Sequence, residues 1–272
     1  MPKRTLNVSI VVYGHQVKDI YTVIHSLFLS ARFANVSKLY LTLIDNKGDF
    51  LYEELMSIIE EMDFSEKYKL SYVIRSDNPG YGVSNNLAIH ESKELYYLIL
   101  NPDVIFQENS LNEALSYMEK CESCILTSPE IRNEYNAVVS GIKRYPSLLV
   151  LFVRFVDIKL LNFLFKRKLD EYTCQDIIDN AKPSKVDIVS GCCMLFKNSS
   201  LLQIGGFSDK YFLYFEDFDL SLRASKIGDL YYVPNFKIKH FGGNTGRKGV
   251  KHIKCFLSSM IKFFCDYKIK VF

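Results

Sequence analysis

Four residues stand out because their types and surroundings suit acid–base chemistry or cation binding. Asp103 interrupts the apolar run "LILNPDVIF" at residues 98–106. Glu216 and Asp217 lie in "YFLYFEDFDL", where five aromatic residues surround three acids. An acid flanked by rings is partly removed from water, which raises its pKa and suits a general base. His240 ends the alternating segment "FKIKH", and one carboxylate with one imidazole leaves Mg²⁺ or Mn²⁺ open positions for phosphate oxygens.

Each of these residues also has a purely structural explanation. Asn, Pro and Asp are the usual residues of a turn, so Asp103 would need no ligand. The two adjacent acids would be first-turn acids favoured by a helix dipole. Asp219 and Arg223 would form an i, i+4 ion pair on an exposed face, and a lone histidine such as His240 would be an ordinary strand-end residue. P-loop, dinucleotide-fingerprint, kinase and nucleophile-elbow motifs are missing from the sequence.

The first hundred residues alternate between strand and helix patterns. Apolar, β-branched runs predict buried strands at residues 7–13, 39–44, 70–74 and 95–100. Apolar residues at helical spacing predict helices at residues 17–31, 51–62 and 84–91. This alternation is typical of βαβ units and predicts an α/β fold with a mainly parallel sheet.

Polar or glycine-bearing clusters follow all four predicted strands. They are Tyr13-Gly14-His15, Asp45-Asn46, Asp77-Asn78 and Asn101-Pro102-Asp103. In parallel sheets the ligand crevice lies beyond the carboxyl ends of the strands. We therefore expect the four clusters to share one edge, which favours a binding site over four unrelated turns.

The second half of the chain is less regular. Residues 142–185 form a basic, apolar segment without clear periodicity. After it, Glu216-Asp217 opens a predicted helix, and residues 231–233 and 236–240 read as two short strands. No internal repeat or low-complexity tract is present.

Composition fits a soluble globular protein, with 48% hydrophobic and 24% charged residues among 272. The seven cysteines are scattered, and Cys121 and Cys124 form a lone C-x-x-C without a second pair at zinc spacing. We expect buried, reduced thiols in a cytoplasmic protein. The N-terminal apolar run is too short for a secretory signal, and no uncharged apolar stretch is long enough for a membrane-spanning helix.

The positive charge is concentrated in two segments. Residues 237–272 carry nine Lys or Arg and one acid, and residues 142–170 carry seven and two, although the whole chain is only +3. An anionic membrane surface is the expected partner, because no nucleic-acid-binding motif is present. In the tail, one helical stripe contains Ile253, Phe256, Leu257, Met260, Ile261 and Phe264. It fits either a helix packed on the core or an interfacial helix on an anionic leaflet.

Seven motifs in a fixed order resemble one enzyme family. They are "SIVVYG", "LIDNKG", "NPGYGVSNN", "LILNPDV", "VSGCCMLF", "IGGFSDKYFLYFEDFDLSLR" and "YYVPNFKIKHFGG". Over about residues 6–251 the chain resembles inverting GT-A glycosyltransferases of family 2, and within it bacterial rhamnosyltransferases of O-antigen and capsule assembly. The resemblance implies a GT-A domain at residues 1–249, with a nucleotide-sugar half to about residue 110 and an acceptor half after it. Residues 250–272 would be a basic amphipathic helix.

The resemblance also implies roles on the donor side. Asp45 would contact the nucleotide base, with the backbone of Tyr13 and Gly14 beside it. In the loop and helix after the third strand, Gly82 and Asn86 would line the nucleotide-sugar pocket.

At the metal, the family more often has D-x-D where this chain has Asn101-Pro102-Asp103. Asp103 would keep the contact with Mg²⁺ or Mn²⁺, and His240 would be the second protein ligand. Asn101 removes one charge from the site, which argues against tight binding of free metal.

On the acceptor side, Asp217 matches the catalytic base, with Glu216 and Arg223 in support, and Gly191 would shape the pocket. The implied reaction moves a deoxyhexose, L-rhamnose from dTDP-rhamnose, onto a lipid-linked saccharide for lipopolysaccharide or capsule synthesis. The enzyme would lie on the cytoplasmic face of the bacterial inner membrane. Two alternatives stay open: another donor such as a UDP-hexose, or a nucleotide-sugar-binding protein without turnover. The intact Glu216-Asp217 pair argues against the second.

Overall fold

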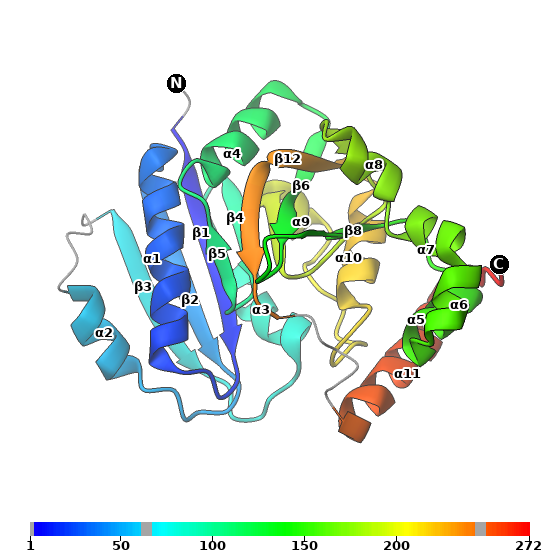
Figure 1. Ribbon diagram of the computed structural model, residues 1–272. Helices are drawn as coiled ribbons and strands as arrows, with labels where there is room; N and C mark the ends of the chain where they lie inside the picture. The colour runs from blue at the N-terminus through cyan, green and yellow to red at the C-terminus, as the bar shows by residue number, and fades with distance from the viewer. Residues whose placement is uncertain (1–2, 61–66, 243–248) are drawn as a thin grey trace.

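A computed structural model describes residues 3–60, 67–242 and 249–272. Its centre is a ten-stranded mixed sheet with helices on both faces, and helices also cluster beside it near the C-terminus (Figure 1). The main path of the sheet runs β3-β2-β1-β4-β11-β6-β12-β5, with β7 added on β6 and β9 on β12. A separate two-stranded sheet pairs β8 with β10.

The nucleotide-sugar half predicted from sequence contains four adjacent parallel strands of the sheet. Its strands are β1 (Thr5–Val12), β2 (Lys38–Asp45), β3 (Tyr68–Ile74), β4 (Tyr96–Leu100) and the short β5 (Val104–Phe106). Its helices are α1 (Val17–Phe33), α2 (Tyr52–Glu60) and α3 (Tyr81–His90). The first four strands are parallel to one another, which confirms the predicted βαβ arrangement. Residue 62, the end of the predicted second helix, lies outside the described residues.

The remaining elements build the rest of the sheet and a helical cluster. The strands are β6 (Cys124–Arg132), β7 (Val138–Val139), β8 (Ile142–Lys143), β9 (Ser184–Lys185), β10 (Ile188–Val189), β11 (Cys193–Lys197) and β12 (Asp229–His240). The helices are α4 (Ser110–Lys120), α5 (Leu148–Val156), α6 (Lys159–Leu164), α7 (Lys166–Tyr172), α8 (Gln175–Asn180), α9 (Asn198–Gln203), α10 (Glu216–Ala224) and α11 (Gly249–Asp266).

Two predicted boundaries were wrong. The helix expected at residues 84–91 begins earlier, at Tyr81, directly after Gly80 with a φ of 102°. The two short strands expected at residues 231–233 and 236–240 are one continuous strand, β12. Its register on β6 shifts between Val233 and Lys237, and this irregularity accommodates Pro234, which has no N–H for a ladder bond.

The two basic segments are neighbours in space. The rings of Phe155 on α5 and Phe256 on α11 stack with centroids 6.1 Å apart. The N–H of Leu148 donates to the carbonyl of Lys270 at 2.8 Å. Figure 1 shows α5, α6 and α11 side by side at one end of the molecule. One surface therefore combines residues that are about a hundred positions apart in the sequence.

The predicted apolar stripe of α11 divides into two faces. Phe256, Met260 and Phe264 pack against an apolar cluster around the fully buried Phe263. Ile253, Leu257 and Ile261 remain exposed. Packing on the core is thus confirmed for one face of the helix, and the other face is free to meet a different partner.

The cysteines and the hydropathy agree with most of the expectations. All seven cysteines are free, and Cys124, Cys174, Cys192 and Cys193 are buried, but burial was wrong for the exposed Cys265. Within residues 3–60, 67–242 and 249–272, no helix combines the length and the apolar character that crossing a bilayer requires.

Candidate active site

The strand-end clusters meet at one edge of the sheet, as predicted. The backbone N–H of Asn46 donates to Val12 O at 3.0 Å, and its side-chain amide donates to Asn78 Oδ1 at 3.2 Å. Asn101 Nδ2 lies 3.5 Å from His240 Nε2, at the end of β12. Strands β1, β2, β4 and β12 and the turn after β3 therefore contribute to the same edge.

Asp103 and His240 are direct neighbours. His240 Nε2 lies 3.1 Å from Asp103 Oδ1, and the two side chains are 16% and 32% exposed. Gly242 makes this approach possible, because a Cβ at that position would come within 2.1 Å of Asp103 Oδ2. The backbone of Phe241 is also tied to the site, since its N–H donates to Asp103 O.

The Asp103–His240 pair fits a divalent cation that also has phosphate ligands. Asp103 Oδ1 is buried and has no hydrogen-bond partner, because the contact with His240 lacks hydrogen-bond geometry. A cation would satisfy this oxygen. Among the described residues no group of three His, Cys, Asp or Glu could hold a metal by itself. A cation here would need further oxygens from a ligand, in agreement with the weak site expected from Asn101.

Two acidic centres can be distinguished, the Asp103–His240 pair and the Glu216–Asp217 pair. The second of them follows a strained turn. Tyr214 and Phe215, directly before α10, have left-handed φ values of 69° and 65°, which bulky residues rarely adopt. Aromatic packing from α11 stabilises this turn. Phe215 lies 5.3 Å from Phe256 and 5.2 Å from Phe263 between ring centroids, and the Tyr214 hydroxyl bonds His252 Nδ1 at 2.9 Å. Helix α11 thus helps to fix the start of α10, where Glu216 and Asp217 lie.

Asp217 and Glu216 occupy different environments. Asp217 stays partly exposed, and its Oδ2 accepts from Gly191 N–H and its Oδ1 from Phe218 N–H, both at 3.0 Å. Glu216 is only 7% exposed, and its Oε2 has no hydrogen-bond partner. Burial, and then the charge of Asp217, raises the pKa of Glu216 to about 8. The protonated form of Glu216 is therefore favoured at neutral pH. Burial also raises the pKa of Asp217, which is the more accessible of the two acids.

Lys143 is a site residue that the sequence did not reveal. It lies on β8, and its Nζ is 5.7 Å from the centre of the Phe218 ring. Burial raises the pKa of Asp217, and the positive charge of Lys143 opposes this rise. Lys143 belongs to the basic segment at residues 142–170, but only the pairing of β8 with β10 brings it to α10. No local pattern would have found it.

A short backbone segment joins the two acidic centres. Gly191 donates to Asp217 from one side, and the next residue, Cys192, accepts from Asn101 N–H at 2.8 Å. Burial raises the pKa of Cys192 to about 12, and the charges of both Asp103 and Asp217 contribute to the rise. Both carboxylates are therefore near this cysteine, and a ligand spanning Cys192 could meet both. A side chain at Gly191 would lie 3.3 Å from Asp217 Cβ.

Three residues assigned to the nucleotide base lie at the same edge. Asp45 is fully buried and accepts hydrogen bonds from Lys47 N–H, Phe50 N–H and the Tyr72 hydroxyl at 2.8–3.0 Å. Its carboxylate therefore shapes the loop after β2.

Tyr13 and Gly14 are more open. Tyr13 is exposed, and its N–H donates to His15 Nδ1 at 2.9 Å. Gly14 has a φ of 66°. For Asp45, Tyr13 and Gly14, contact with a nucleotide stays a prediction.

Three other assigned residues have structural contacts. Gly82 lies in α3 instead of a loop, and a Cβ there would come within 2.9 Å of Phe207. Both ends of the Asn86 amide bond the Phe207 backbone at 2.8 Å. Arg223 binds Asp219 as well as the carbonyls of Ile204 and Gly206.

The contacts of Arg223 confirm its i, i+4 pair with Asp219, but the pair does not lie on an exposed face, because Asp219 is buried. Arg223, Asn86 and Gly82 all support the Gly205–Phe207 turn. The predicted contacts of these three residues with substrate stay predictions.

Sequence comparison finds rhamnosyltransferases among the similar proteins, although no family model matches. The chain is 28% identical over 212 residues to the rhamnosyltransferase WbbL of Escherichia coli, covering 75% of this chain and 73% of that protein. It is also 28% identical over 204 residues to an N-acetylglucosaminyl-diphospho-decaprenol L-rhamnosyltransferase of Mycobacterium tuberculosis. That match covers 70% of this chain and 64%, less than two thirds, of the mycobacterial protein.

Fold comparison decides the architecture. The chain superimposes on a crystal structure of GalNAc-T7 with UDP, GalNAc and Mn²⁺ with a TM-score of 0.69 and 13% identity, covering 97% of this chain and 48% of that one. The fold is GT-A. A structure of Staphylococcus aureus TarS residues 1–349 agrees, with a TM-score of 0.54, 12% identity and coverage of 85% and 60%. These comparisons confirm the predicted resemblance to rhamnosyltransferases, the GT-A fold and the enzyme class, glycosyltransferase.

The charge of Lys143, which opposes the rise in the pKa of Asp217, predicts a specific change in pH dependence. Removing the charge in Lys143→Met should raise the pKa of Asp217, so the acid limb of the kcat/KM profile should move to higher pH. Lys143→Arg keeps the charge and should leave the limb in place even if the rate falls. The other titratable groups facing Asp217 are Glu216, Tyr81, Tyr172 and Cys192, and they are the same in both variants.

The pH–rate profiles of the wild type and both variants provide the measurement. An acid limb that stays in place in Lys143→Met, with only a lower plateau, would show that Lys143 does not act through the ionisation of Asp217.

Proposed function

We propose that the protein is an inverting glycosyltransferase that moves L-rhamnose from dTDP-rhamnose to a hydroxyl of a lipid-linked saccharide. The observation that carries this proposal is the environment of Asp217: a partly exposed carboxyl group, oriented by two backbone N–H groups and separated by Gly191-Cys192 from the Asp103–His240 pair. The names of the relatives favour rhamnose as the sugar and a lipid diphosphate as the carrier. O-antigen or related surface-polysaccharide synthesis is the corresponding pathway class.

The proposed reaction is a single displacement. Asp217 takes the proton from the acceptor hydroxyl, whose oxygen forms a bond to the anomeric carbon. The bond from that carbon to the diphosphate oxygen breaks on the opposite face, so the anomeric centre inverts and the nucleoside diphosphate leaves. Protonated Glu216 keeps a second negative charge away from Asp217, and the two backbone donors hold the carboxylate in a fixed orientation.

Asp103 and His240 are the residues that would hold Mg²⁺ or Mn²⁺. When bound, the cation supplies positive charge for the departing diphosphate. Asn101 lies next to His240 and restricts the position of its ring. Burial lowers the pKa of His15, and the charge of Asp103 opposes this shift.

A donor screen tests the proposed function. The purified protein is incubated with dTDP-rhamnose, UDP-glucose or UDP-galactose and a bacterial membrane extract as acceptor source, and the products are identified by mass. We expect a deoxyhexose adduct with dTDP-rhamnose, and NMR of the product should show an inverted anomeric configuration. A hexose adduct would support the UDP-hexose alternative. No adduct with any donor and acceptor would contradict an enzymatic role.

We also propose that the enzyme is peripheral on the cytoplasmic face of the bacterial inner membrane. Support comes from a surface formed by α5, α6 and the outer face of α11, which we name the apolar platform. Its exposed residues include Phe152, Phe155, Leu160, Phe163, Leu164, Ile253, Leu257 and Ile261. No residue of α6 is buried, and Phe163 is 77% exposed. Such a patch marks an interaction surface in a soluble domain.

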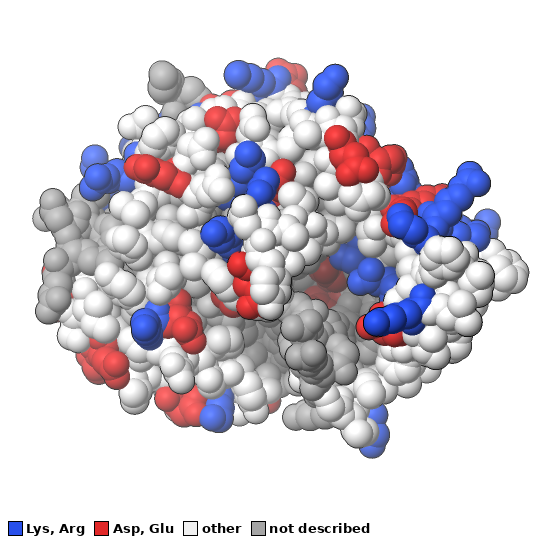
Figure 2. All heavy atoms as spheres, viewed as in Figure 1, with Lys and Arg blue, Asp and Glu red and all other residues white. Residues whose placement is uncertain are grey.

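The charge around the apolar platform favours an anionic lipid surface as its partner. Lys159, Lys166, Arg167 and Lys168 lie on or beside α6. Figure 2 shows Lys and Arg side chains gathered on the side where Figure 1 places α6, α7 and the C-terminus. Each basic residue near an anionic leaflet contributes about 1 kcal/mol, and inserted apolar side chains add to this.

The apolar platform predicts salt-sensitive binding to vesicles that contain phosphatidylglycerol. Phe163→Glu/Leu164→Glu should weaken this binding at least about tenfold, because it removes two apolar side chains and adds two negative charges. Tyr135→Glu is the matched control, since Tyr135 is 81% exposed on the turn between β6 and β7, away from the platform. Co-sedimentation at low and high salt measures the effect.

Equal binding to neutral and anionic vesicles, or no binding at low salt, would contradict the membrane proposal. Deleting residues 250–272 is a poor alternative test, because α11 stabilises the Tyr214–Phe215 turn before the acidic pair. The exposed double variant avoids this problem.

A further inference from the structure

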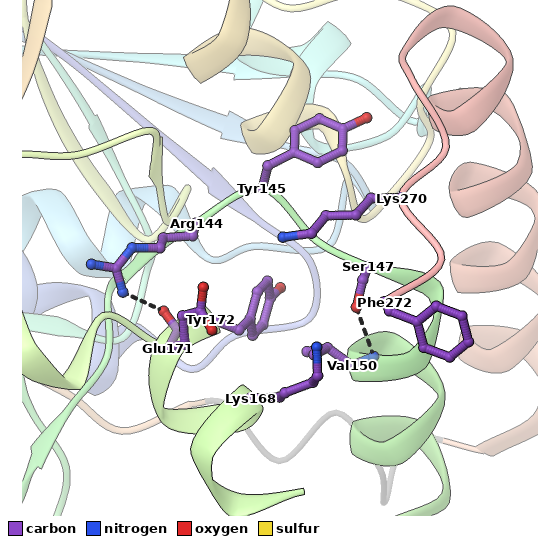
Figure 3. A pocket seen from close by; sticks show the side chains of 9 residues that line it. All are labelled: Arg144, Tyr145, Ser147, Val150, Lys168, Glu171, Tyr172, Lys270 and Phe272. Carbon is purple, nitrogen blue, oxygen red and sulfur yellow. Dashed lines mark hydrogen bonds between the residues drawn. The ribbon is translucent and has the colours of Figure 1, made fainter.

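A cavity with a basic lining lies between α5, α7 and the C-terminal segment. Its lining includes Arg144, Ser147, Lys168, Glu171, Tyr172 and Lys270, and the enclosed space of about 30 Å³ opens to solvent. Figure 3 shows Lys270 reaching in from the C-terminal segment and Lys168 from α7. The contacts described above for the two acidic centres do not use this cavity.

The two lysines of the cavity, Lys168 and Lys270, are exposed at its mouth. Arg144 is already neutralised, since it binds both oxygens of Asp176 at 3.0 and 2.7 Å and also donates to Glu171 O. Within the described part of the chain, Lys168 and Lys270 take part in no salt bridge. Glu171 supplies one negative charge against these two ammonium groups. Lysines that line one small space repel each other, so an anion between them is stabilising.

The cavity is next to the centre that contains Asp217. Tyr172 lines the cavity and packs in the same apolar cluster as Phe215 and Phe218. Burial raises the pKa of the Tyr172 phenol, and the charge of Asp217 adds to the rise. Lys143 and Arg144 are adjacent in the sequence but act at different places. The charge of Lys143 opposes the rise in the pKa of Asp217, and Arg144 lines the cavity.

The cavity also borders the apolar platform. Val150 of α5 and Phe272 line it, and the backbone of α5 is held to the C-terminal segment by Leu149 N–H donating to Val271 O at 3.1 Å. The basic cavity thus shares Tyr172 with the apolar cluster around Phe215 and Phe218, and it shares α5 with the platform. A substrate that carries a sugar, a diphosphate and a lipid chain in that order would match the centre at Asp217, the basic cavity and the apolar platform, respectively.

We infer that the cavity binds the diphosphate that links the acceptor saccharide to its lipid. Lys168 and Lys270 contact the diphosphate oxygens, the saccharide hydroxyl reaches Asp217, and the lipid chain leaves along the apolar platform. Lysine ammonium groups are suited to phosphate as point charges. This inference rests on the proposed function, because it assigns a subsite to the proposed lipid-linked acceptor.

The test compares two soluble acceptors that carry the same sugar in a vesicle-free assay. One is a short-chain prenyl diphosphate sugar, and the other is an alkyl glycoside without phosphate. In Lys168→Gln/Lys270→Gln, the ratio of kcat/KM for the diphosphate acceptor over the glycoside should fall about tenfold or more, because charge-assisted contacts are lost. Lys168→Arg/Lys270→Arg should restore most of the ratio.

The matched control is Lys38→Gln/Lys93→Gln, which removes two exposed lysines at the opposite edge of the sheet. It should leave the ratio unchanged, and thermal melting should show that all variants are folded. Transfer to both acceptors with an unchanged ratio in Lys168→Gln/Lys270→Gln would overturn the inference. If the same variant also bound anionic vesicles more weakly, the cavity would instead serve phospholipid headgroups. No transfer to either acceptor by the wild type would mean that the proposed function itself had failed.

Discussion

Asp217→Asn should lower kcat by about 10²–10⁴-fold, the usual cost of losing a general base. The amide keeps the size of the side chain but cannot take the proton from the acceptor. It also retains only one oxygen for the two N–H groups of Gly191 and Phe218, so a local shift adds to the loss. Donor binding should survive if Asp217 acts on the acceptor hydroxyl, as proposed. Single-turnover rates and donor titration by calorimetry separate the two effects.

Glu216→Gln is the informative partner of this variant. Because the pKa of Glu216 is raised to about 8, the wild-type side chain is neutral at pH 7, and a neutral amide replaces it with little change in charge. We expect a loss of less than about tenfold at neutral pH, well below that of a missing general base. If Glu216→Gln lost more activity than Asp217→Asn, the two acids would have to exchange roles.

Asp103→Ala and His240→Ala should each lower activity about 10²-fold or more, because the departing diphosphate loses the cation that balances its charge. The fold should persist, since both side chains lie at the edge of the sheet and are partly exposed. Wild-type activity should require Mg²⁺ or Mn²⁺. Calorimetry provides a second measurement: the nucleoside diphosphate should promote Mn²⁺ binding in the wild type and not in either variant.

Asn101→Asp is the complementary variant, because it adds a negative charge to the proposed metal site. An added carboxylate beside His240 should strengthen the binding of free Mn²⁺, because the wild-type pair offers one carboxylate and one imidazole. Full activity of the wild type in excess EDTA would contradict the metal role of Asp103 and His240.

Local patterns in the sequence determined the parallel half of the molecule. Apolar runs of strand length and helical spacing of apolar residues depend on neighbours within a few positions, so β1 to β4 and the helices between them could be read directly. The rule that ligands bind at the carboxyl ends of parallel strands then placed residues 13–15, 45–46 and 101–103 at one edge. The observed contacts confirm that edge.

Resemblance supplied the roles that patterns could not. It singled out Asp103, His240 and Asp217, and the structure brings the first two into contact and places the third one short segment away. It also assigned the nucleotide-sugar pocket to Asn86 and a role in support of Asp217 to Arg223. The polar atoms of both residues bind the Gly205–Phe207 turn, and the assigned roles stay predictions. A motif match identifies which residue type stands at a position. It does not show whether that side chain contacts substrate or only other parts of the protein.

Only the tertiary structure decided how the two adjacent acids differ. Glu216 is buried and its pKa is raised to about 8, while Asp217 is partly exposed and its raised pKa is opposed by the charge of Lys143, which is more than seventy positions away in the sequence. The same holds for the two basic segments, which form one surface because aromatic residues of α5 and α11 pack together. Burial and the charge of distant neighbours set the pKa of an acid, and both depend on contacts between segments that no local pattern encodes.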